Sequence, residues 1–154
     1  MQDILTDIDY APRLASKTKR WLACLVDYLI LCTVAGILSY VFGKHYTGED
    51  GVSGWELTGV PAFFAMILPW LLFFPGIESF NNGQTLGKAL FRLRTVKEDN
   101  SRLSFGNSFV KHLFDPIDYF PFFGITGLIV ASNNKNKQRV GDLVAKTIVV
   151  EVKK

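Results

Sequence analysis

The sequence predicts an all-α integral membrane protein with two full transmembrane helices, a broken or re-entrant third hydrophobic segment, an interfacial amphipathic helix and a small cytoplasmic β element. Three observations support this prediction. Residues 21–42 and 60–77 are almost entirely apolar, and residues 113–131 are apolar but interrupted by prolines and aspartates. The chain of 154 residues is 49% hydrophobic and contains 13 phenylalanines, which is a high apolar content for a soluble domain of this length.

The first hydrophobic segment, residues 21–42, is long enough to cross a bilayer. At about 1.5 Å per residue a helix of this length extends about 33 Å, against roughly 30 Å for the hydrocarbon layer. The basic sequence KTKR at 17–20 precedes it, so the positive-inside rule places the N-terminal tail, residues 1–20, in the cytoplasm. The segment exceeds the apolar core of a signal peptide, roughly 7–15 residues, and we expect it to be retained.

The second span, residues 60–77, contains no charged residue. The connection before it, residues 43–59, carries more acidic than basic side chains and fits the outer side of the membrane. Pro69 lies in the middle of the span and predicts a kink, because proline lacks the amide that a helix needs. Lipid offers no hydrogen-bond partner for the freed carbonyl, so we expect this span to pack against the first.

Residues 78–112 carry six basic and three acidic side chains and are expected to remain in the cytoplasm. Around residues 86–94, apolar side chains alternate with Lys88, Arg92 and Arg94, which is typical of an interfacial helix on anionic lipid headgroups. Farther along, residues 93–96 and 102–105 flank the polar turn KEDNS and predict a short β-hairpin.

The third hydrophobic segment, residues 113–131, allows two topologies. A single crossing would place residues 132–154 outside, although they carry six basic and two acidic side chains. We therefore expect a re-entrant hairpin broken between Pro116 and Pro121, with both termini in the cytoplasm. The run at 144–152 is rich in β-branched residues and predicts a cytoplasmic strand. Residues 21–152 thus form a single membrane domain.

Asp27 is the one ionised group within the first span. An aspartate at that depth costs about 2.5–3.5 kcal/mol, so it must face a partner or a wet cavity. It is either a titratable centre or a neutralised carboxylate that locks helices together. Arg20, seven residues earlier, lies on the same helix face but about 10.5 Å away along the axis. It either opens a polar track, with Asp142 folding back to pair with it, or extends to lipid phosphates.

Three further aspartates have structural alternatives. Asp142 follows a glycine and fits a helix N-cap or turn as well as an ion pair. Asp115 and Asp118 could add cation or proton ligands where the broken segment exposes backbone carbonyls. Asp115 precedes Pro116 and is better explained as a helix cap, whereas Asp118 lies deeper in the segment.

The sequence contains no pattern for a metal, a cofactor or an enzyme. His45 and His112 lack ligand spacing to another histidine or cysteine. The GQTLGK motif at 83–88 has three residues between its glycines instead of four and is followed by Ala89, so it is a turn rather than a phosphate loop. No serine has the surroundings of a hydrolase nucleophile. A net charge of +3 does not indicate nucleic-acid binding.

Together, Arg20, Asp27, Asp142 within QRVGDLVAKTIVV, and GQTLGKALFRLRTV at 83–96 resemble the RDD family of bacterial membrane proteins, named for one arginine and two aspartates. The resemblance covers roughly residues 12–150. It implies that the arginine opens the first transmembrane helix, that one aspartate lies within that helix and that the other lies near the C-terminus. Lys146 departs from the pattern, because family members often have glycine before the threonine.

The resemblance also implies transport of ligands not yet identified, with sodium/proton exchange in some members. We therefore expect transport or exchange of a small cation or solute, with Asp27 as the titratable centre. The alternative is a non-catalytic scaffold or accessory subunit whose Arg20, Asp27 and Asp142 fix helix packing. Two spans and a hairpin are too few to enclose a pathway, so transport requires a homo-oligomer or a larger membrane partner. The expected location is the bacterial inner membrane, in contact with anionic headgroups.

Overall fold

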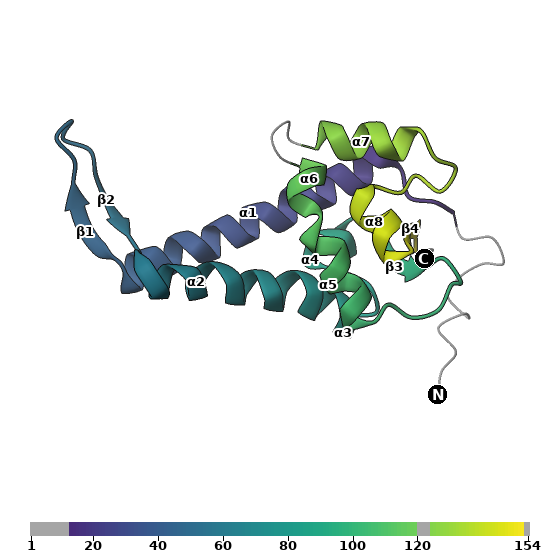
Figure 1. The fold of residues 1–154 in the computed structure, drawn as a ribbon, viewed down its shortest axis with the longest axis horizontal. Coiled ribbons are helices and arrows are strands. Elements are labelled where there is room, and N and C mark those ends of the chain that lie inside the picture. Colours follow the sequence, from purple (N-terminus) through teal and green to yellow (C-terminus); the bar gives the residue numbers. More distant parts are fainter. Residues whose placement is uncertain (1–12, 120–123, 153–154) are drawn as a thin grey trace.

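Two long helices extend from a compact base in the computed structural model, which describes residues 13–119 and 124–152 (Figure 1). The first is α1 (Lys17–Phe42), and the second runs through α2 (Gly59–Leu71), the π-helical segment η2 (Leu72–Ile77) and α3 (Glu78–Phe80). With 26 and 22 residues, both are long and apolar enough to cross a membrane. They match the two predicted spans and extend beyond them.

The surfaces of these helices differ from those of helices in a soluble core. In α1 the fully buried residues are Ala23 and Asp27, and α2 has none. Large apolar side chains such as Leu29, Phe63 and Met66 are exposed instead. A soluble protein would bury such a surface, whereas lipid covers it at no hydrophobic cost.

The far end of α1 turns into a β-hairpin that the sequence did not reveal. Gly43 ends the helix, and a Cβ there would lie 2.2 Å from the Ser39 carbonyl oxygen, so only glycine fits. Strands β1 (Lys44–Thr47) and β2 (Ser53–Glu56) then pair antiparallel. Neither strand buries one face, so the alternating apolar pattern by which a strand is predicted is absent.

The second span continues through Pro69 without a break. The irregularity follows in η2, which contains Pro75 and has the wider turn of a π-helix. The Ser79 hydroxyl donates to the Pro75 carbonyl oxygen at 2.6 Å. Phe74 of η2 and Glu78 at the start of α3 lie in the interior of the base, where both are buried.

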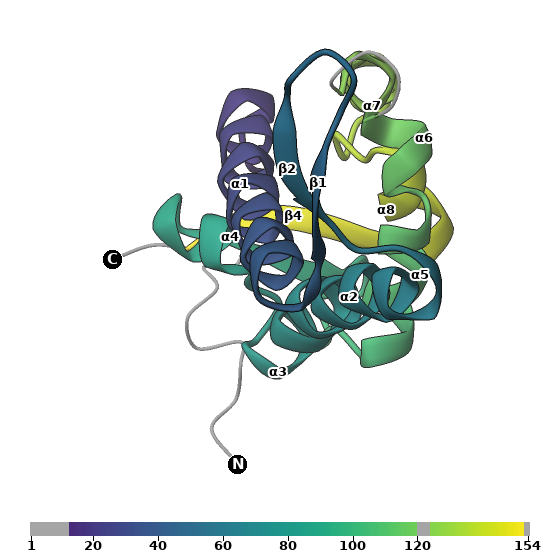
Figure 2. The same ribbon diagram turned by 90° about the vertical axis from the view of Figure 1, so that its left-hand side faces the viewer.

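The base consists of short helices around a two-stranded sheet and the start of α1 (Figures 1 and 2). Its sheet pairs β3 (Leu93–Lys97) antiparallel with β4 (Thr147–Glu151), with Leu93 opposite Glu151. Leu14 forms a bridge to Val150, so the segment before α1 lies beside the last strand. The helices of the base are α4 (Leu86–Leu90), α5 (Phe105–Leu113), α6 (Asp115–Tyr119), α7 (Ile125–Ser132) and α8 (Val140–Ala145).

Two predictions about β structure need correction. The predicted hairpin of residues 93–96 with 102–105 is wrong, because β3 pairs with β4. Pairing with the C-terminal strand buries Val149 and Val150, and burial of apolar side chains outweighs the shorter loop of a local hairpin. The predicted strand at 144–152 is present but begins at Thr147, after Lys146 ends α8 with φ = 52°.

The predicted interfacial helix is shorter than expected. It is reduced to α4, and Lys88 is buried instead of facing headgroups. In the third hydrophobic segment, α6 has five residues and α7 has eight, too few for either to cross a membrane. Pro116 lies within α6, and Pro121 lies outside the described residues.

We predict opposite effects for two glycine substitutions. Gly87→Ala places a Cβ 2.1 Å from the Ala23 backbone oxygen, which separates α4 from α1 and costs about 1–3 kcal/mol. Gly36→Ala meets no atom within 4 Å and favours the helix by about 1 kcal/mol. Thermal unfolding of the solubilised protein compares the two. Equal stability of both variants would contradict the close contact between α1 and α4.

Candidate functional site

Asp27 is bound by the start of α4. The Thr85 hydroxyl donates to Asp27 Oδ2 at 2.6 Å, and the Gly87 amide donates to Oδ1 at 2.7 Å. Thr85 also caps α4 by accepting a hydrogen bond from the Lys88 amide. Asp27 is 2% exposed, and a Cβ on Gly87 would lie 2.9 Å from its carboxyl carbon. Both carboxylate oxygens therefore have a donor, and α4 fills the space beside them.

Of the two alternatives for Arg20, the structure shows the ion pair with Asp142. Arg20 forms an ion pair with Asp142 Oδ2 and donates to the Lys137 carbonyl oxygen. Its side chain is 8% exposed, so it does not extend to lipid phosphates. Asp142 also accepts a hydrogen bond from the Arg139 amide at 3.1 Å. The N-cap of α8 is Arg139 and Asp142 lies three residues after it, so Asp142 forms the ion pair and is not the N-cap residue.

Asp118 joins α6 to α8. Its two oxygens accept from the amides of Val140 and Gly141 at 3.0 and 3.1 Å. Burial raises the pKa of Asp118, although Arg139 and these amides act in the opposite direction. The capping role that we predicted for Asp115 belongs to Asp118 instead. Asp115 bonds to His112 through one oxygen, and its other oxygen has no hydrogen-bond partner among the described residues.

Glu78 is the centre of a cluster that the sequence did not predict. It is 0% exposed, and both of its oxygens accept hydrogen bonds from side chains of α4, β3 and α5. The donors are Lys88, Lys111 at 2.9 Å, Thr95 at 2.7 Å, Ser108 and His112 at 3.0 Å. Two sequence features could have indicated this cluster. Glu78 directly follows an uncharged span, and Ser108 and Lys111 are three residues apart, on one helix face.

The pKa values of the two lysines in this cluster shift in opposite directions. Burial, which Glu78 offsets only in part, lowers the pKa of Lys88 to about 8. Burial acts in the same direction on Lys111, but the charges of Glu78 and Asp142 outweigh it and raise the pKa of Lys111. The Lys111 ammonium lies 3.7 Å from Asp142 Oδ1. Lys111 is therefore the permanent cation that links the two acids.

His112 lies between two carboxylates. Nδ1 is 2.6 Å from Asp115 Oδ2, and Nε2 is 3.0 Å from Glu78 Oε2. Its ring packs against Phe74 with 4.8 Å between centroids. Burial would lower the pKa of His112, but Asp115 and Glu78 outweigh it and raise that pKa.

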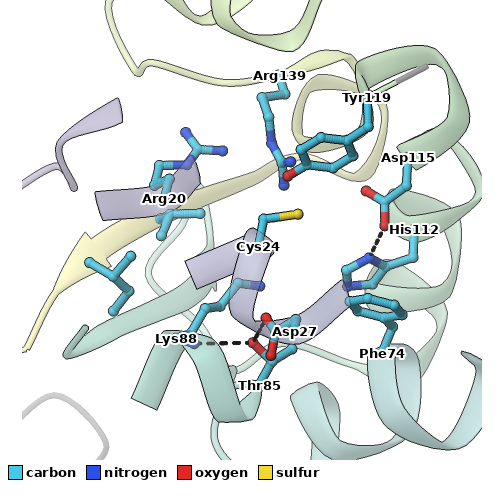
Figure 3. Close-up of a pocket in the computed structure, with 12 residues that line it drawn as sticks. Arg20, Cys24, Asp27, Phe74, Thr85, Lys88, His112, Asp115, Tyr119 and Arg139 are labelled. Atoms are coloured by element: carbon cyan, nitrogen blue, oxygen red, sulfur yellow. Dashed lines mark hydrogen bonds and ion pairs between the residues drawn. The ribbon is translucent and has the colours of Figure 1, made fainter. Parts of the chain in front are cut away.

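His112 and Asp115 lie in the wall of a small cavity, which side chains of α1, α4 and α6 also line (Figure 3). Its volume is about 20 Å³, enough for one water molecule and too small for a solute. Arg139 lies over the Tyr119 ring at 4.8 Å. Among the described residues, Arg139 Nε and Nη1 and Asp115 Oδ1 are buried without a hydrogen-bond partner. The charged residues of the wall are Arg20, Asp27, Lys88, His112, Asp115 and Arg139.

A larger hollow lies between α1 and α2. This groove has a volume of about 850 Å³ and is lined by apolar side chains such as Leu31, Phe64 and Leu72, with no charged residue. Within the described parts of the chain, no group of three or more histidine, cysteine, aspartate or glutamate side chains is placed to hold a metal ion. Among the described residues, the buried charged groups therefore gather in the base.

Comparisons with known proteins agree with the resemblance in the sequence. The sequence model of the RDD family matches residues 14–146. The chain is also similar to the Bacillus subtilis (strain 168) "Uncharacterized protein YckC", with 26% identity over 130 residues, which cover 82% of this chain and 78% of that protein. No solved structure matches the chain.

The two buried lysines are expected to respond differently to substitution. Lys111→Met leaves Glu78 and Asp142 without their shared cation, and breaking such a buried pair costs about 3–5 kcal/mol. Lys88→Met costs less, about 1 kcal/mol, because Glu78 keeps Lys111 and His112. Denaturant unfolding at neutral pH measures the difference. A larger loss in the free energy of unfolding for Lys88→Met than for Lys111→Met would contradict the role of Lys111 as the cation shared by Glu78 and Asp142.

Proposed function

Because the chain belongs to the RDD family and has two helices suited to crossing a membrane, we propose that it is a multi-pass protein of the bacterial inner membrane that acts as a non-catalytic scaffold or accessory subunit. In this role its buried charges hold the two spans and the base in one arrangement. The observation that carries the proposal is the state of Asp27, whose two oxygens are already bound by Thr85 and Gly87.

The other acids support the same role, because each joins separate elements. Asp142 connects α8 to α1 through Arg20, and Asp118 connects α6 to α8. Lys111 connects Glu78 to Asp142 and so joins the second span to the same group. Buried polar networks whose members are satisfied rigidify a structure, whereas loss of one partner is costly.

The contacts of Arg13 and Lys19 with the last strand support a topology in which both ends of the described chain lie in the cytoplasm. The Glu151 amide donates to the Arg13 carbonyl oxygen at 2.9 Å, and Lys19 forms an ion pair with Glu151 at 2.9 Å. The start of the first span and the last strand therefore share one end of the helix pair. An even number of crossings accounts for this, with residues 113–131 re-entrant or at the interface. Exposed basic residues of this base that would meet anionic headgroups are Arg13, Lys19, Arg92, Lys135 and Lys146.

Transport of a small cation or solute is the second candidate. The charged cavity favours it, since Asp115 Oδ1 and two Arg139 nitrogens face it without a hydrogen-bond partner among the described residues. In that case Asp115 and His112, rather than Asp27, would be the exchanging groups. The pathway would have to form between copies of the chain or with a larger membrane partner.

Asp27→Asn and Asp115→Asn together separate the two candidates. Asparagine offers one acceptor oxygen where Thr85 and Gly87 provide two donors, so we expect a stability loss of about 1–3 kcal/mol and less folded protein in the membrane. Reconstituted wild-type vesicles are expected to move neither protons nor Na⁺. The exposed Glu49→Gln serves as control. Flux of protons or Na⁺ in the wild type that Asp115→Asn abolishes, with folding unchanged, would contradict the scaffold and support transport.

The topology has a separate test in reporter fusions. A reporter placed after Lys154 is expected to be active on the cytoplasmic side, and one inserted at Glu49 in the hairpin connection on the outer side. A reporter after Lys154 that is active outside would require residues 113–131 to cross the membrane.

A further inference from the structure

We propose that His112, held between Glu78 and Asp115, forms a proton-binding site that locks the second span to the base, and that loss of this proton loosens α5 and α6. The inference adds a response to pH to the proposed scaffold. It stands on the geometry of three side chains and needs no transport activity.

The distances require an additional proton in this triad. Both ring nitrogens of His112 lie at hydrogen-bond distance from carboxylate oxygens, at 2.6 Å and 3.0 Å. A carboxylate only accepts hydrogen bonds, and a neutral imidazole has a single N–H. Both contacts are satisfied only when the ring is an imidazolium or one carboxyl group is protonated. Either way, the triad holds one proton more than a neutral histidine between two carboxylates.

The two acids depend on this proton to different degrees. Glu78 also forms ion pairs with Lys88 and Lys111, so it keeps counter-charges when His112 becomes neutral. For Asp115, by contrast, the ion pair with His112 is the one found among the described residues. Asp115 is 3% exposed, and loss of this pair leaves Arg139, which lies beyond ion-pair distance, as its counter-charge. Because Glu78 keeps two close ion pairs, deprotonation weakens the attachment of α6 more than that of the second span.

Other titratable and charged groups also face this site. Arg20, Cys24 and Asp27 of α1 line the cavity beside His112, together with Lys88 of α4, Tyr119 of α6 and Arg139 before α8. Tyr28 of α1 packs against Phe74, with 5.2 Å between their ring centroids, and its phenol interacts directly with Asp115. On α5 itself, Lys111 shares Glu78 with His112.

The triad connects three elements. Glu78 lies at the end of the second span, His112 on α5 and Asp115 at the start of α6. Because the pKa of His112 is raised, its contribution to stability is complete below the ordinary histidine pKa, about 6.5, and is lost as the pH rises through the raised value.

A titration of the histidine ring tests the proposal directly. The chain has two histidines, so His45→Gln leaves His112 as the one imidazole signal in ¹⁵N NMR of the full chain in phosphatidylethanolamine/phosphatidylglycerol nanodiscs. We expect a midpoint above the ordinary histidine value of about 6.5. Amide hydrogen exchange in residues 105–119, corrected for the intrinsic effect of pH, is expected to increase across the same midpoint.

Matched variants identify the groups responsible. Asp115→Asn removes a charge from the triad and is expected to lower the midpoint of His112. Asp118→Asn removes the other buried acid of α6, whose oxygens bind α8, and is expected to leave the midpoint unchanged. A midpoint at or below about 6.5 in the His45→Gln protein, or exchange that does not respond at the midpoint, overturns the proposal. This measurement decides even if Asp115→Asn or Asp118→Asn does not fold, and it does not depend on the flux assay.

Discussion

The burial of Glu78, at the end of the second long helix that enters the base, is the constraint on which the base depends. This carboxylate is 0% exposed, and a buried charge is tolerated only with counter-charges and hydrogen bonds around it. Lys88 comes from α4, whereas Lys111 and His112 come from α5. The position of these two helices against the second span follows from that requirement.

The short motif GQTLGK serves both spans at once. Thr85 and Gly87 bind Asp27 of the first span, and Lys88 binds Glu78 of the second. Gly83, at φ = 81°, begins this segment with a conformation that favours glycine, and a Cβ there would lie 2.0 Å from the Thr95 carbonyl oxygen. One connection of the base thus fixes the relative position of α1 and the second span.

The molecule separates its apolar and charged side chains by location. The two long helices expose Leu, Phe and Met side chains, whereas the base encloses Asp27, Glu78, Asp118 and Asp142. Lys111 extends the Glu78 cluster to Asp142, and Asp142 extends it to Arg20 of α1. Because the charges are paired within the chain, the base can lie against a membrane without leaving isolated ions near lipid.

The sequence alone determined the two long apolar helices, the C-terminal strand and the need of Asp27 for a partner, because span length and an isolated charge are local properties of a segment. The tertiary structure decided the partners themselves. Glu78 contacts His112, 34 residues away, and β3 pairs with β4 instead of with residues 102–105. Burial favours these contacts between residues distant in sequence. From the sequence, Lys88 was predicted to contact lipid headgroups and His112 to stand alone. In the fold, both are buried beside Glu78.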